Sequence, residues 1–134
     1  MTNISRVRFL YLACAAALGW LAAPNAFAHA RMVRSTPKNG VELSESPKAL
    51  ELWFSELLDD SFNTVELYDA KETKDRKNLL PDKPQVDAKD RTHLTVRLPL
   101  LKPGAYLVEY RILSRDGHTA PGRLSFTITG KPRG

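Results

Sequence analysis

The residues of this sequence best suited to binding a metal ion are His29, Asp116 and His118. If the chain is cut before His29, that residue offers two nitrogens to one ion, the terminal amine and the ring nitrogen nearest the backbone. A free α-amine has a pKa of roughly 7.7 to 8.0, so a strongly Lewis-acidic metal displaces its proton at little cost near neutral pH. Nitrogen ligands in a planar arrangement favour Cu(II). A terminal histidine by itself is more often incidental, so a metal site requires further ligands nearby.

The second half of this candidate site is the polar segment Ser114-Arg115-Asp116-Gly117-His118. If residues 116–118 are extended, the side chains of Asp116 and His118 leave the same face of the backbone about 6 to 7 Å apart, near enough to meet on one ion. Gly117 gives the backbone freedom to arrange them. The alternative is an Asp-Gly turn followed by a surface histidine. Taken alone, the tripeptide leaves both interpretations open.

The first 28 residues have the pattern of a secretory signal peptide, which decides whether His29 becomes terminal. Arg6 and Arg8 precede an apolar run over residues 9–23, and Ala26-Phe27-Ala28 places small residues at both positions that signal peptidase reads. The run is too short to span a membrane comfortably, and no second run of spanning length follows. We therefore expect a signal peptide over residues 1–28 and a mature periplasmic domain over residues 29–134.

A cut after Ala30 is the alternative, because Ala28-His29-Ala30 also satisfies the small-x-small rule, and it would remove His29. With cleavage after Ala28, the mature chain keeps 18 of the 20 Lys and Arg residues and all 15 Asp and Glu residues. This net charge of about +3, spread in mixed-sign runs, does not resemble a nucleic-acid footprint. The single cysteine, Cys14, leaves with the signal, so the mature domain has neither a disulfide nor a thiolate ligand.

The elements that must position these residues are short strands with alternating apolar side chains and turn residues between them. We expect strands over residues 31–36, 50–55, 64–68, 94–98, 105–113 and 124–128. Asp69 to Arg91 is rich in Lys and Asp and contains two prolines, so we expect a long solvated connection with one irregular edge strand at most. About seven strands in a hundred residues predict an all-β, immunoglobulin-like Greek-key sandwich or barrel. Such a fold does not itself name a function.

The mature chain resembles the CopC family of periplasmic copper-binding proteins over nearly its whole length. The resemblance is carried, in order, by the histidine start, Ser35-Thr36-Pro37 with Gly40, Leu52-Trp53-Phe54-Ser55-Glu56, Pro103-Gly104-Ala105-Tyr106, and residues 114–118 with Gly122 and Phe126 beyond. It implies a β-sandwich or barrel that holds one Cu(II) ion. His29 would supply amine and imidazole, His118 a second imidazole, and Asp116 a carboxylate near the metal. Glu56 matches a further acidic position of the family, although a solvated charge at a strand end explains it equally well.

The sequence departs from some family members in lacking a methionine-rich Cu(I) site. Soft thioethers select the cuprous ion, but the connection from Asp69 to Arg91 contains no methionine, and the mature domain has only Met32, which we place in the first strand. The resemblance also suggests an inner-membrane copper transporter of the CopD type as a partner. We expect that partner to be a separate protein, and the mature domain to be a monomer.

The leading prediction is therefore a copper-binding protein without enzymatic turnover. A histidine-brace copper oxidase or monooxygenase is the enzyme alternative, but it needs an open copper position that a carboxylate two residues from His118 would crowd. A metal-free immunoglobulin-like interaction module is the third possibility. We interpret His93 as a solvated histidine at a strand end, and Trp53, Tyr106 and Tyr110 as packing residues. Arg31 is expected to be a surface charge.

Overall fold

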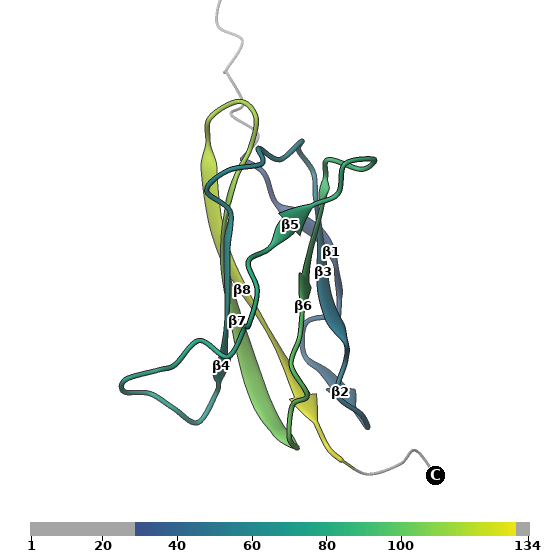
Figure 1. Cartoon of the computed structure of the whole chain (residues 1–134), viewed down its shortest axis with the longest axis vertical. Coiled ribbons are helices and arrows are strands. Elements are labelled where there is room, and N and C mark those ends of the chain that lie inside the picture. The colour runs from purple at the N-terminus through teal and green to yellow at the C-terminus, as the bar shows by residue number, and fades with distance from the viewer. Residues whose placement is uncertain (1–28, 131–134) are drawn as a thin grey trace, which may run out of the picture.

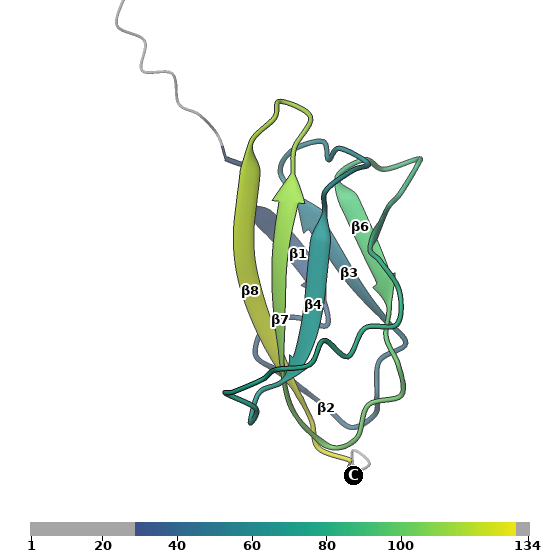
Figure 2. The same cartoon turned by 60° about the vertical axis from the view of Figure 1, so that its left-hand side comes forward.

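The computed structural model describes residues 29–130, which form two four-stranded β-sheets facing each other (Figures 1 and 2). One sheet has the strand order β1-β3-β6-β5 and the other the order β2-β8-β7-β4. The strands are β1 Met32–Thr36, β2 Val41–Leu43, β3 Ala49–Phe54, β4 Thr64–Asp69, β5 Gln85–Val86, β6 His93–Arg97, β7 Gly104–Leu113 and β8 Thr119–Ile128. The predicted signal peptide over residues 1–28 lies outside the described residues.

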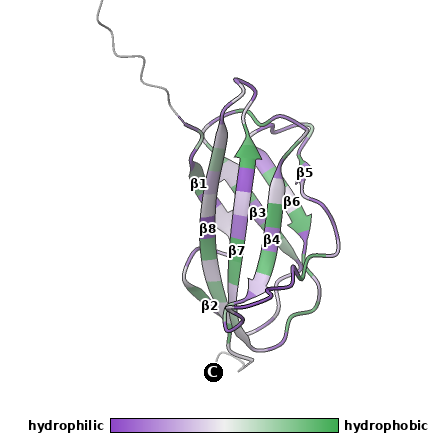
Figure 3. Ribbon diagram, turned by 90° about the vertical axis from the view of Figure 1, so that its left-hand side faces the viewer, coloured by the Kyte–Doolittle hydropathy of each residue, from purple (hydrophilic) through white to green (hydrophobic). Residues whose placement is uncertain are grey.

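The core lies between the two sheets because each strand turns alternate side chains inward. In β3 the buried residues are Leu50, Leu52 and Phe54, and in β7 they include Val108 and Ile112. Figure 3 shows β7 with a hydrophilic stretch in its middle and hydrophobic residues on both sides of it. The prediction of an all-β sandwich is confirmed. Within residues 29–130 there is no helix that is long and apolar enough to cross a membrane.

Two strands differ from the sequence prediction. The three-residue strand β2 was not predicted, because its pairing with the end of β8 is parallel and long-range and is too short for a periodic pattern. Strand β8 begins at Thr119, well before the predicted start at Leu124. Pro121 fits there because β2 covers only Val41 to Leu43, so the other edge of β8 near Pro121 requires no amide donor. The irregular edge strand expected between Asp69 and Arg91 is β5.

One end of the sandwich gathers the segments that carry the candidate ligands. The antiparallel pairing places Met32 of β1 beside Phe54, the last residue of β3, and an isolated bridge joins Leu58 to Ser114. The hairpin between β7 and β8 and the start of β1 therefore lie at the same end, as Figures 1 and 2 show. The segment before β1, the β3–β4 loop and this hairpin thus approach one another.

Candidate metal site

The β7–β8 hairpin holds Asp116 and His118 in a tight turn. The amide of Ser114 donates to the carbonyl of His118 over 2.9 Å, and the amide of Gly117 donates to the carbonyl of Ser114 over 2.9 Å. Gly117 has a φ of 88°, in the left-handed region that favours glycine. The extended conformation considered for residues 116–118 is therefore wrong, and the Asp-Gly turn is correct. The turn nevertheless brings the two side chains together.

Asp116 is the acceptor at the centre of this turn. Its Oδ1 accepts a short hydrogen bond from the Ser114 hydroxyl and another, of 3.1 Å, from the backbone amide of His118. Its Oδ2 lies 3.1 Å from Nδ1 of His118. The Ser114 hydroxyl, then the His118 amide, then the His118 side chain lower the pKa of Asp116 from 3.8 to about 2. The carboxyl is thus an ionised acceptor at every pH at which the protein is expected to work.

The contact between Asp116 and His118 selects which ring nitrogen can face a metal ion. A carboxylate beside Nδ1 favours the tautomer with a proton on that nitrogen, so that Nε2 carries the lone pair that could face a metal ion. The side chain of His118 is 44% exposed, so an ion can reach it. Asp116 therefore orients His118, as partners of metal-bound histidines commonly do.

His29 comes from the other end of the domain sequence but lies beside His118. The centroids of the two imidazole rings are 5.9 Å apart, and the rings are tilted by 57°. Two imidazoles that bind one ion at roughly 2.0–2.1 Å per nitrogen have centroids about 4.5 to 6.3 Å apart, depending on the angle at the metal. The observed separation of 5.9 Å lies within that range, so the distance between the two rings is compatible with a shared ion.

Glu56 lies in the β3–β4 loop at the same end of the sandwich and is partly buried. Among residues 29–130, no three His, Cys, Asp or Glu side chains converge into a complete metal-binding group. In the chain of 134 residues the nitrogen of His29 is an amide linked to Ala28, not an amine. A ligand set that includes the terminal amine is therefore complete only after cleavage.

His93 is not the solvated strand-end histidine predicted from the sequence. Its ring stacks on the indole of Trp53 with centroids 4.3 Å apart and planes within 4°. The side chain is only 13% exposed and lies between Glu51, 3.4 Å from Nε2, and Asp87, 3.5 Å from Nδ1. The prediction was wrong because the stack depends on the cross-strand register Trp53↔His93, which the sequence does not reveal.

The other side of the Trp53 indole carries Arg34, whose guanidinium carbon lies 3.7 Å from the ring centroid. Arg34 and His93 pair with Trp53 from β1 and β6, the two strands that flank β3. Trp53 is thus a packing residue, as predicted, but it packs on the outer face of the sheet. Tyr106 and Tyr110 pack inward, against Phe126 and Phe54 respectively, which confirms their predicted role.

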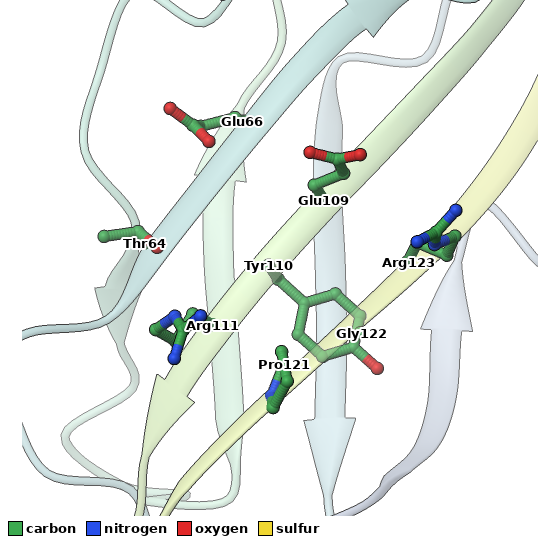
Figure 4. Close-up of a pocket in the computed structure, with 8 residues that line it drawn as sticks. All are labelled: Thr64, Glu66, Glu109, Tyr110, Arg111, Pro121, Gly122 and Arg123. Carbon is green, nitrogen blue, oxygen red and sulfur yellow. The ribbon is translucent and has the colours of Figure 1, made fainter.

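The outer face of the other sheet carries a polar pocket of about 460 Å³ (Figure 4). It is lined by Thr64, Glu66, Glu109, Tyr110, Arg111, Pro121, Gly122 and Arg123. None of the predicted metal ligands is among these residues. Figure 4 also shows the ring of Tyr110 against Gly122 of β8, where a Cβ would clash with it. This pocket is separate from the candidate metal site.

The fold agrees with the comparison of this chain with known proteins. The CopC domain matches residues 32–129, so the chain belongs to the CopC domain family. This confirms the resemblance inferred from the sequence.

Curated relatives extend over most of the chain. It is 30% identical over 125 residues to protein YobA of Escherichia coli K12, covering 92% of this chain and 98% of YobA. It is 32% identical over 112 residues to copper resistance protein C of Xanthomonas campestris pv. juglandis, covering 81% and 86% respectively. It is also 32% identical to the copper transport protein CutJ of Bacillus subtilis, where 81% of this chain matches 19% of CutJ.

Two solved structures share the fold. The first is CopC from Methylosinus trichosporium OB3b, with a TM-score of 0.68 and 27% identity over 75% of this chain and 94% of that one. The second is PcoC, a methionine-rich copper resistance protein from Escherichia coli, with a TM-score of 0.64 and 25% identity over 76% and 100% of the two chains. This chain contains only two methionines, Met1 and Met32, and therefore differs from PcoC in that respect.

Proposed function

We propose that this protein is a periplasmic carrier that holds one Cu(II) ion through His29 and His118, with Asp116 beside them and Glu56 as a further candidate ligand. The observation that supports this most directly is the 5.9 Å separation of the two imidazole rings, which residues far apart in the sequence reach only through the fold. Membership of the CopC domain family and the relatives named for copper transport and copper resistance supply the choice of metal.

The oxidation state follows from the chemistry of the available ligands. An amine, two imidazoles and a carboxylate are nitrogen and oxygen donors, which suit Cu(II), whereas Cu(I) prefers thioethers and thiolates. Met32, which is the one methionine in residues 29–130, is partly buried against the core in β1. We therefore propose a single Cu(II) site and no methionine-rich Cu(I) site.

Removal of residues 1–28 is part of this proposal, because it converts the His29 amide into an amine. A peptide nitrogen carries no available lone pair, so the precursor offers one nitrogen where the mature chain offers two. Cleavage after Ala28 would thus create the ligand at the moment when the protein reaches the compartment in which it works. Cleavage after Ala30 would delete it.

Carriage of copper, for sequestration or for delivery to a separate membrane transporter of the CopD type, explains the site better than turnover does. The relatives named for copper transport and copper resistance favour carriage of the ion. The rings of His29 and His118 are both accessible at one end of the domain, which suits transfer of the ion to a partner.

The experiment is native mass spectrometry of the mature chain beginning at His29, with one equivalent of Cu(II). We expect one bound ion, weakened binding in His118→Ala, and weakened binding when one glycine precedes His29. His93→Gln is the matched control, because this histidine stacks on Trp53 outside the site, and it should retain the ion. Undiminished binding by His118→Ala would refute the assignment, and copper-dependent oxidation of a substrate would favour the enzyme alternative.

A further inference from the structure

The chain immediately after His29 is hydrogen-bonded to Ser55, the residue that follows the end of β3. The amide of Ser55 donates to the carbonyl of Arg31 over 2.9 Å, and the amide of Arg31 donates to the hydroxyl Oγ of Ser55 over 3.1 Å. Both backbone groups of Arg31 are therefore bound to a single residue. This pair lies just before β1 and just after β3, beyond the ladder that begins at Met32 and Phe54.

The hydroxyl of Ser55 takes the place of a backbone acceptor. Two residues facing each other in a hydrogen-bonded antiparallel pair normally exchange two amide-to-carbonyl bonds. Here one of the two bonds ends on the side chain of Ser55 instead, so the pairing continues for one more residue although β3 has ended. A residue without an acceptor in its side chain would leave the amide of Arg31 to water.

Between this attachment and the candidate ligand there is only Ala30. Ala30 is 6% exposed and belongs to the hydrophobic core, whereas His29 is exposed. The amino-terminal residue is thus one residue from a buried side chain and two residues from a double hydrogen bond. A chain end with neither attachment would lose much more conformational freedom on binding an ion.

From these contacts we infer that Ser55 is a positioning residue for the copper site, a role that rests on the function proposed above. Its hydroxyl keeps residues 29–31 in the arrangement that places His29 beside His118 before the ion arrives. If an ion binds only molecules in this arrangement, its apparent affinity is proportional to the fraction of molecules that have the arrangement. Ser55 therefore acts on copper through Arg31 and the amino terminus without touching the ion.

The expected size follows from the single bond that the hydroxyl makes. A hydrogen bond of this kind changes an equilibrium by about twofold to tenfold. In Ser55→Ala we therefore expect the dissociation constant for Cu(II) to rise by that factor, and the amide of Arg31 in the copper-free protein to exchange its hydrogen faster by a similar factor. Ser55→Thr retains the hydroxyl and should restore both quantities.

The test uses the mature chain, Cu(II) competition against a chromophoric chelator, and hydrogen exchange of the Arg31 amide measured by NMR. Ser125→Ala is the control, because Ser125 is an exposed strand serine whose hydroxyl makes no hydrogen bond among residues 29–130. Lower thermal stability of Ser55→Ala with unchanged copper affinity would overturn the positioning role, as would unchanged exchange at Arg31.

The copper measurement also separates this inference from the function on which it rests. If His118→Ala weakens copper binding but Ser55→Ala does not, only the role of Ser55 is overturned. If His118→Ala binds copper as tightly as the unaltered chain, the site itself is wrong, and positioning by Ser55 is overturned with it.

Discussion

Replacing Asp116 by asparagine would test how the hairpin prepares His118 for a metal ion. The carboxylate accepts at Oδ1 from the Ser114 hydroxyl and the His118 amide, and Oδ2 faces Nδ1 of His118 at 3.1 Å. With its amide oxygen in the Oδ1 position, asparagine would direct an NH2 group at Nδ1. Two donors cannot face each other, so the ring would move its proton to Nε2, the nitrogen needed by the metal.

We expect Asp116→Asn to raise the dissociation constant for Cu(II) about tenfold to a hundredfold, the usual effect of losing the partner of a metal-bound histidine. Competition against a chelator measures the affinity, and the ¹⁵N shifts of the His118 ring in the copper-free protein report its tautomer. Asp82→Asn is the matched control, since Asp82 pairs with Arg97 on the sheet. An Asp116→Asn affinity within twofold of the unaltered chain, with the proton still on Nδ1, would refute this reasoning.

Three further predictions concern charge and packing. The carboxyl of Asp116 should titrate near pH 2 by ¹³C NMR. Because its folded pKa lies below the ordinary value of 3.8, its contribution to stability is present above pH 3.8 and is lost as the pH falls through about 2. Titration of this carboxyl near pH 4 would contradict the prediction. Gly122→Val should lower the free energy of unfolding by about 1–3 kcal/mol in urea, because a Cβ there meets the ring of Tyr110, and full stability would contradict the packing. His93→Ala should lower it by about 0.5–1.5 kcal/mol and alter the fluorescence of Trp53, the one tryptophan after residue 28; an unchanged spectrum would argue against the stack.

The sequence was sufficient for the strands that have one buried face, because alternation is a local signal. Leu50, Leu52 and Phe54 all lie in the core, as their spacing indicated. The sequence was insufficient for β2, because its parallel pairing is only three residues long. It was also insufficient for the first half of β8, where Pro121 obscures the strand pattern. The turn at Gly117 was one of two open conformations, and the hydrogen bonds from Ser114 and to His118 decide between them.

The candidate site divides in the same way between local and tertiary information. By itself the sequence determined which atoms are available: a histidine after a cleavage motif, an Asp-Gly-His segment, and almost no sulfur ligand. Only the tertiary structure decided that His29 lies beside His118 and that Asp116 faces Nδ1 of His118. It likewise decided that the amide of Arg31 donates to the hydroxyl of Ser55, and that the ring of His93 stacks on Trp53. Each of these contacts joins segments through strand register or a tight turn, and register is set by the packing of the whole sandwich rather than by neighbouring residues.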